Sequence, residues 1–378
     1  MFEILLTLIF IRPFISSLAF PYANFTYSAC LLIFLVLWLI YKGVTIKKIQ
    51  ILKYPLILFS LAIIISTIFS IDKFNSLREI YKYVTGLFLF LIITSLTSKE
   101  RIRIIRTIIL AGLIISLLAV YQYFFGFQNV MDYIARKGIT DYFTLDYLAR
   151  RRVYLPFATP NALAGYLILV LPLVLIIKDK KRWIILLSIF FALLLTKSLG
   201  AFLSIFLVSI IYFYLEGKLE KRKVIFLLGL LVIMGLVFMA RSTTQKQHTQ
   251  PIFSTTMRLS YWKDTLEIIK ESPFTGVGLG NFNLAQSRYA HNSYLQLWAE
   301  MGILGIISIL WLVATVFKSA LKNIPKDTQK NQIISLIAAN TVFLTHNFVD
   351  FTFFLPEVAL IWWILIGLSI PCVHTATA

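Results

Sequence analysis

The sequence predicts an all-α polytopic membrane protein with about 12 transmembrane helices. Hydrophobic residues make up 59% of the 378-residue chain and charged residues only 14%. A soluble domain of this length cannot bury so much apolar surface. Apolar segments of nearly twenty residues recur along the chain, and each can cross about 30 Å of hydrocarbon. Because no internal repeat, low-complexity tract or soluble domain is visible, we expect residues 1–378 to form a single membrane domain.

Hydropathy places twelve spans in the chain. The first carries Arg12 and Pro13 and lacks a small-residue cleavage site, so we interpret it as a retained helix rather than a signal peptide. The seventh and eighth spans form a hairpin that turns at Ser198-Leu199-Gly200. In order, the predicted spans are residues 4–20, 25–41, 54–71, 83–97, 104–125, 157–177, 183–197, 199–215, 224–240, 302–317, 333–349 and 355–371.

The net charge of +19 would suggest nucleic-acid binding in a soluble protein, but here most basic residues mark membrane topology. Five short loops carry lysine and arginine clusters, and all five fall on one side if the N-terminus is inside. By the positive-inside rule that side is the cytoplasm, and both termini face it. We therefore expect membrane lipids, and no nucleic acid, as partners. The clusters are Lys42, Lys47, Lys48 and Lys53; Lys99, Arg101, Arg103 and Arg106; Lys178, Lys180, Lys181 and Arg182; Lys218, Lys221, Arg222 and Lys223; and Lys318, Lys322, Lys326 and Lys330.

Two longer loops are expected on the outer side, a smaller one at 126–156 and a large one at 241–301. Long ordered loops in a compact protein are usually functional. Within the large loop, Met257–Ser272 has a helical pattern that Ser272-Pro273 ends. We expect this amphipathic helix to lie along the outer membrane boundary. Its predicted apolar face consists of Leu259, Trp262, Leu266 and Ile269.

The end of the large loop carries polar residues at the mouth of the tenth span. The stretch from Ala290 to Glu300 contains His291, Asn292 and a carboxylate. Histidine can exchange protons near neutral pH, and at a membrane boundary it can meet both a lipid-borne and a water-borne substrate. His291 is therefore the leading candidate for a catalytic residue.

Arginines on the outer side need an explanation besides topology. Pairing with lipid headgroups is one, and a shared anion site is the other. Guanidinium groups bind phosphate oxygens in pairs and stay charged, which makes arginine a preferred ligand for a diphosphate. The outer-side arginines are Arg150, Arg151, Arg152, Arg258 and Arg288.

Three polar residues near span ends are further candidates. His346 and Asp350 are four residues apart, which places them on one face of the eleventh predicted helix. Ionisable groups at membrane depth are candidates for function, although a role in helix packing is an equal alternative. Asn161 follows Thr159-Pro160 at the start of the sixth span, where it would either cap the helix or contact substrate.

The glycines at 276, 278 and 280 are more typical of a tight backbone path than of a nucleotide loop, because no Gly-Lys-Ser/Thr follows them. We expect them to return the loop to the membrane and present His291. The outer loops contain neither an Asp-x-Asp nor a His-x-x-Glu-His pattern, and Asp132, Asp141 and Asp146 are scattered. We therefore expect no metal site and no cofactor.

Four stretches resemble the O-antigen ligase and polymerase superfamily, whose members have many spans and use undecaprenyl-diphosphate-linked glycans. The chain is most like an O-antigen ligase, and the match runs from about residue 150 to 367. The four stretches are Arg152-Val-Tyr-Leu-Pro-Phe-Ala-Thr-Pro-Asn161-Ala-Leu-Ala-Gly-Tyr; Arg258…Trp262 with Pro273-Phe-Thr-Gly-Val-Gly-Leu-Gly-Asn-Phe282; Ala290-His291-Asn292…Leu295…Glu300-Met-Gly302-Ile-Leu-Gly305; and His346-Asn-Phe-Val-Asp350…Pro356.

One departure from the family pattern lies in the hairpin turn. Family members often carry Ser-Arg-Gly where this chain has Ser198-Leu199-Gly200. The neighbouring Lys197 would supply the missing charge, but as a point charge rather than as a fork of donors.

The resemblance implies a metal-independent, inverting transfer of O-antigen glycan from undecaprenyl diphosphate to a sugar hydroxyl of lipid A–core. It places the active site at the periplasmic face of the bacterial inner membrane. His291 is then the general base, with Arg152, Arg258 and, less directly, Arg288 binding the diphosphate. Glu300 would orient His291 or bind the acceptor. The other candidates for substrate contact are Asn161, Asn292, His346 and Asp350.

Other functions remain open at this point. An O-antigen polymerase, which joins two lipid-linked glycans, shares the same motifs; the length of 378 residues without an appended soluble domain favours the ligase. A transporter of the same lipid would be expected to show internal halves, broken spans and midplane charges, whereas the polar chemistry here concentrates at the outer boundary. A purely structural membrane subunit leaves the His291-Asn292…Glu300 group unexplained.

Overall fold

The computed structural model describes residues 1–42, 50–138, 148–217, 220–244, 253–322, 324 and 330–371. The regular elements in these ranges are all helices. Two residues named above as scattered loop acids, Asp141 and Asp146, lie outside the described residues, as do parts of both predicted outer loops.

Each of the twelve predicted spans overlaps a helix, although several of these helices are shorter than predicted. Within the described ranges, six helical segments are long and apolar enough to cross a membrane: Pro21–Lys42, Gln50–Ile68, Ser98–Lys137, Leu199–Glu216, Lys221–Arg241 and Ser293–Lys322. The chain is therefore an all-α membrane protein with several spans. The helices that overlap the predicted spans are α1 Phe2–Ile11, α2 Pro21–Lys42, α3 Lys53–Ile68, α4 Lys73–Ser95, α5 Ser98–Tyr121, α8 Pro160–Val170, α9 Arg182–Thr196, α10 Leu199–Glu216, α11 Lys221–Thr244, α13 Ser293–Lys322, α14 Lys330–His346 and α15 Pro356–Leu368.

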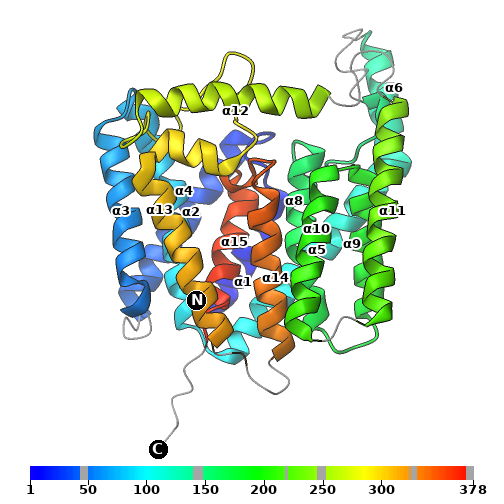
Figure 1. The fold of residues 1–378 in the computed structure, drawn as a ribbon, viewed down its shortest axis with the longest axis horizontal. Helices are drawn as coiled ribbons and strands as arrows, with labels where there is room; N and C mark the ends of the chain where they lie inside the picture. Colours follow the sequence, from blue (N-terminus) through cyan, green and yellow to red (C-terminus); the bar gives the residue numbers. More distant parts are fainter. Residues whose placement is uncertain are drawn as a thin grey trace, which may run out of the picture.

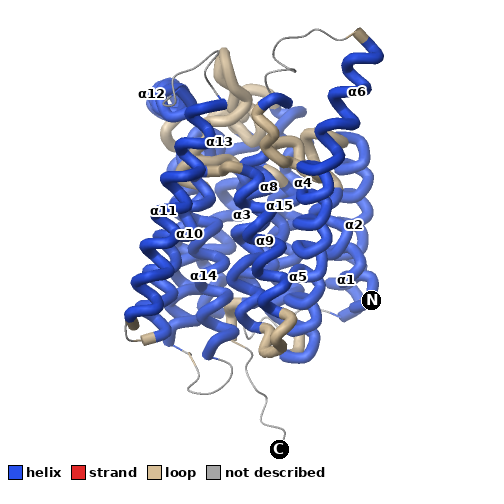
Figure 2. Tube along the Cα trace, turned by 90° about the vertical axis from the view of Figure 1, so that its right-hand side faces the viewer, coloured by secondary structure: helices blue, strands red, loops and turns tan. Residues whose placement is uncertain are grey.

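The helices form a bundle whose two ends differ (Figures 1 and 2). Helix α12, Phe253–Glu271, lies across one end, nearly perpendicular to the bundle, and α6, Phe127–Lys137, projects at that same end. The connections α4–α5 and α10–α11 lie at the opposite end. The helix predicted for the large loop is thus confirmed, although it begins four residues earlier than Met257.

The prediction of a first span from 4 to 20 is wrong in its length. Helix α1 ends at Ile11, and a short 3₁₀ turn, Arg12–Phe14, follows it. The Arg12 guanidinium is only 1% exposed; it donates to Asn24 Oδ1 at 2.8 Å and lies 3.4 Å from Glu357 Oε2. A buried charge needs such partners, and the chain bends where it reaches them.

The predicted apolar face of α12 is also only partly right. Leu259 and Leu266 are exposed, whereas Thr265 and Ile269 are buried against the loop below. The buried side of this helix includes polar residues because it covers the candidate site, and two of its leucines therefore face outward.

Helix α13 is interrupted where the large loop crosses it. Gly302 has φ 66° and ψ −173°, and the backbone of Phe274 lies so close that a Cβ at Gly302 would overlap its carbonyl oxygen. Backbone hydrogen bonds from Val277 N to Ala299 O at 2.8 Å and from Ile303 N to Pro273 O at 2.9 Å hold the crossing together. Glycine is needed here for both its conformation and its size.

We expect Gly302→Ala to lower the melting temperature of the purified protein by several degrees. The new methyl group would overlap the carbonyl of Phe274, and alanine rarely adopts the positive φ of this position. Gly235→Ala in α11 is the matched control, since nothing lies within 4 Å of a Cβ added there. Equal melting temperatures for the two variants would contradict the crossing described above.

Candidate active site

His291 occupies the turn that leads into α13. Its backbone is left-handed, with φ 52°, a conformation that few residues other than glycine adopt. The next residue, Asn292, caps the helix: its side-chain oxygen accepts from Tyr294 N at 3.0 Å and from Leu295 N at 3.2 Å. Asn292 therefore fixes where α13 begins, directly after the histidine.

Aromatic rings surround the His291 imidazole. Tyr261 of α12 stacks on it with ring centres 5.8 Å apart, and Phe351 meets it edge-on at 4.8 Å. The other neighbour of Phe351 is Tyr289, stacked at 4.0 Å. Burial lowers the pKa of His291 below its ordinary value, Asp350 opposes that shift, and the positive charge of Arg258 adds to it. The neutral imidazole, which can accept a proton, is thereby favoured.

Asp350 brings residues from two other elements to the same place. Its Oδ2 atom lies 3.9 Å from Arg258 Nη2 and 3.9 Å from His346 Nε2. The predicted proximity of His346 and Asp350 is thus confirmed, but α14 ends at His346 and the aspartate follows in the turn beyond it. The other oxygen, Oδ1, accepts from Phe351 N at 2.8 Å, which fixes the carboxylate.

Buried polar atoms in this group lack partners among the described residues. The atoms without a hydrogen bond are His291 Nδ1, both ring nitrogens of His346 and Asp350 Oδ2, and the aspartate is only 1% exposed. Buried polar atoms are nearly always hydrogen-bonded in folded proteins, so such exceptions commonly mark a site where a ligand binds. These atoms come from the loop before α13, the last residue of α14 and the turn after it.

Arg152 and Asn161 form a neighbouring pair. Arg152 donates from Nη2 to Asn161 Oδ1 at 2.9 Å and from Nε to Thr196 O at 2.8 Å. Asn161 does not cap α8, because Thr159 does so by accepting from Ala162 N at 3.2 Å. The capping alternative considered for Asn161 is therefore wrong.

His346 connects the two groups. It packs against Gly165 of α8 and Gly200 of α10, where added Cβ atoms would lie 3.3 Å from its Nε2 and 3.7 Å from its Nδ1. The ring thus lies between α8, whose first turn carries Asn161, and the Asp350 carboxylate. Arg152, Asn161, His346, Asp350, Arg258 and His291 make up one continuous group, which we call the outer polar cluster.

Two other predicted residues lie apart from this cluster. The Glu300 carboxylate accepts from Gln296 Nε2 and from Gly280 N, both at 2.9 Å, and is 2% exposed. Arg288 is exposed, and no hydrogen bond or ion pair found among the described residues joins it to the cluster. No group of three or more His, Cys, Asp or Glu side chains within the described ranges is placed to hold a metal ion.

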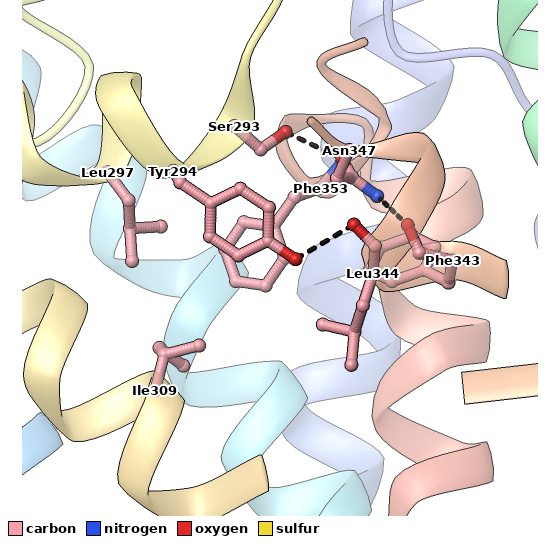
Figure 3. Close-up of a pocket in the computed structure, with 8 residues that line it drawn as sticks. All are labelled: Ser293, Tyr294, Leu297, Ile309, Phe343, Leu344, Asn347 and Phe353. Carbon is pink, nitrogen blue, oxygen red and sulfur yellow. Dashed lines mark hydrogen bonds between the residues drawn. The ribbon is translucent and has the colours of Figure 1, made fainter. Parts of the chain in front are cut away.

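An apolar pocket lies beside the cluster, between α13 and α14 (Figure 3). Its cavity volume is about 20 Å³, room for about one water molecule. Ser293 and Asn347 lie at one side of it, and Ser293 donates to Asn347 Oδ1 at 2.6 Å and to the Asp350 carbonyl at 3.1 Å. Tyr294 crosses the pocket and donates to the carbonyl of Leu344 at 2.8 Å. The pocket therefore adjoins the backbone of Asp350.

A family model described as O-antigen ligase matches residues 183–310 of the chain. This segment of the chain is therefore similar to the O-antigen ligase family, which supports the resemblance to the O-antigen ligase and polymerase superfamily. No curated protein sequence matches it. The matched part contains Arg258, His291 and Glu300 and leaves out both ends of the outer polar cluster, Arg152 with Asn161 and His346 with Asp350. In the folded structure those residues lie beside the segment that the family model matches.

The departure of this chain from the superfamily pattern has a structural counterpart. Lys197 stands one residue before Ser198 in the left-handed turn between α9 and α10, and its amine donates to the Arg150 carbonyl at 3.0 Å. The amine lies close enough to Arg152 for their charges to interact. A cation is thus present beside Arg152 even though the superfamily arginine is replaced by Leu199.

Sequence reasoning missed several residues of the site. Tyr261 lies three residues after Arg258 on α12, so helical spacing from the arginine could have found it. Arg241, at the end of α11, interacts electrostatically with Arg258 and Arg150. Phe351 and Asn347 had no distinguishing signal, because their roles depend on contacts between α13 and the turn after α14.

Proposed function

We propose that this protein transfers O-antigen glycan from undecaprenyl diphosphate to a hydroxyl of lipid A–core, with inversion and without a metal ion. The match of residues 183–310 to the O-antigen ligase family model supports O-antigen ligase or polymerase activity in general. The finer proposal is supported by the approach of Arg258 and His346 to the Asp350 carboxylate. Nearby, His291 Nδ1 has no hydrogen-bond partner within the described chain.

In this proposal His291 acts as the general base. The acceptor hydroxyl gives its proton to the imidazole while its oxygen attacks the anomeric carbon from the face opposite the diphosphate. The bond from that carbon to the diphosphate oxygen breaks, and the electron pair leaves with the diphosphate. A single displacement of this kind inverts the anomeric centre. A positioned base contributes on the order of 10²–10⁴-fold to such a step.

The cations of the outer polar cluster stabilise the leaving group. Negative charge grows on the diphosphate as the bond breaks, and fixed positive charges in a partly dehydrated site oppose that growth. Arg258 and Arg152 are the proposed ligands, with Lys197 and Arg241 adding positive potential nearby. Arg288, being exposed, is at most a peripheral ligand.

The proposed topology has twelve spans in one membrane domain of the bacterial inner membrane, with both termini in the cytoplasm. The loops 126–156 and 241–301, and with them His291, then face the periplasm. Single cysteines at exposed Tyr22 and at Lys180 can be labelled with a membrane-impermeant maleimide in spheroplasts. Labelling at Lys180 but not at Tyr22 would reverse this orientation.

The deciding experiment supplies purified protein with the lipid-linked O-antigen, with or without lipid A–core. A ligase forms product only when both are present. Chain extension from the donor alone would instead identify a polymerase, and movement of the lipid across vesicles without bond formation would identify a transporter.

We expect the rate of transfer to stay high at mildly acidic pH. The base must be neutral, and its lowered pKa keeps it so below the ordinary histidine value of about 6.5. Turnover should therefore fall only when the pH drops below the ordinary histidine value and reaches the lowered pKa of His291. A kcat profile with its acid limb above pH ~6.5 would mean that His291 is not the group that titrates.

A further inference from the structure

We propose that Gln296 and Glu300 are positioning residues that hold the backbone of His291 in its left-handed turn. The inference rests on the proposed function in one respect, because it assigns these residues to the catalytic base. It goes beyond that function because it gives a role to the buried Glu300 carboxylate and to the Gln296 amide, which lies one helical turn before it.

The two side chains form a chain of three hydrogen bonds. Ala290 N donates to Gln296 Oε1 at 3.2 Å, Gln296 Nε2 donates to Glu300 Oε1 at 2.9 Å, and Gly280 N donates to Glu300 Oε2 at 2.9 Å. The orientation of the amide is fixed by its neighbours, since a backbone N–H needs an oxygen and a carboxylate needs a donor. The glycine segment is thereby linked to the residue just before His291.

His291 is held from both sides by the first turns of α13. Ala290, which precedes it, bonds to Gln296, and Asn292, which follows it, caps the same helix. A non-glycine residue in the left-handed region stays there only when its surroundings enforce it. These two anchors supply that enforcement, and the position of the imidazole between Tyr261 and Phe351 follows from them.

Glu300 is buried and bonded to protein donors. Both carboxylate oxygens accept hydrogen bonds from protein donors, and the residue is 2% exposed. Its backbone carbonyl also accepts from Ser66 Oγ at 2.7 Å and from Gly278 N at 3.1 Å. Of the two roles considered for Glu300, orienting His291 is therefore the one its contacts support, and it acts through Gln296.

The chemistry of the pair provides a reciprocal test. Gln296→Glu alone sets two carboxylates against each other, and Glu300→Gln alone leaves one side-chain oxygen to serve two donors. The double variant restores all three bonds, because a glutamate at 296 accepts from Ala290 N and from the amide at 300, whose oxygen accepts from Gly280 N. We expect each single variant to lower kcat about 10- to 10²-fold, as small misplacements of a catalytic group do.

The double variant should recover most of the lost kcat, while affinity for the diphosphate lipid stays within about twofold in all three proteins. Unchanged kcat in both single variants would overturn the inference, and so would a double variant no better than the worse single one. If a single variant does not fold, Gln296→Met, similar in shape but without hydrogen-bonding groups, replaces it, with the same split expected between kcat and donor affinity.

The His291→Ala background separates this inference from the proposed function. If Gln296 acts through His291, adding Gln296→Glu to His291→Ala changes the residual turnover by less than about twofold, because coupled residues are not additive. A full multiplicative loss would show that Gln296 acts independently of the base, and would overturn the inference alone. Wild-type turnover of His291→Ala itself would instead overturn the proposed function.

Discussion

Replacing His291 by alanine is expected to remove glycan transfer, with kcat falling about 10²–10⁴-fold while the protein still inserts and binds donor. The side chain is the one proton acceptor that the turn before α13 presents to the cluster, and its Nδ1 has no partner among the described residues. Binding should survive, because the proposed diphosphate ligands Arg152 and Arg258 belong to other elements. Single-turnover measurements with purified protein and labelled donor separate the two effects.

His291→Gln is the matched control for this prediction. Glutamine fills part of the same space between Tyr261 and Phe351 and can hydrogen-bond, but it cannot take up a proton near neutral pH. Both variants should therefore be equally slow. Turnover near that of the wild type in either of them would remove His291 from the mechanism and leave it as a packing residue.

The positions of the helices were predictable from the sequence because each follows an apolar run, although only six helical segments in the described ranges reach the length that a membrane requires. The end of the first helix was not. Arg12 bends the chain there because it pairs with Glu357, which lies 345 residues later. No local pattern announces such a partner. The same limit applies to Arg101, counted among the cytoplasmic loop charges, which is 4% exposed and donates to carbonyls at the ends of α4 and α15.

The members of the site were easier to predict than their arrangement. His346 and Asp350 were paired by their spacing, and Arg152, Asn161 and His291 were found as unusual polar residues near span ends. What the sequence could not say is that α8 and α10 each present a glycine to His346. That packing joins the Arg152 pair to the Asp350 group, and it depends on three helices far apart in the chain. Superfamily motifs identify residues, whereas their contacts decide which of them act together.

Replacing Arg258 by alanine is expected to weaken donor binding about 10- to 10²-fold, the range given by about 1.5–3 kcal/mol for a hydrogen bond to a charged group. Arg258→Lys should lie between, since lysine keeps the charge but loses the planar fork. Arg288→Ala is the matched control: it removes a charge from the same loop, yet Arg288 is exposed and lies outside the cluster, so affinity should change less than about twofold. Binding of undecaprenyl diphosphate to protein in nanodiscs is the measurement.

The loss could arise in a second way, because Arg258→Ala also leaves the buried Asp350 carboxylate without its cation. An uncompensated negative charge would repel a diphosphate even if the arginine never touched it. Adding Asp350→Asn to Arg258→Ala removes that charge. If affinity returns, Arg258 serves to neutralise Asp350; if it stays low, the guanidinium itself binds the donor. Unchanged affinity in both Arg258→Ala and Arg152→Ala would leave the diphosphate site without support, and the acid–base chemistry of His291 would then need a different leaving group.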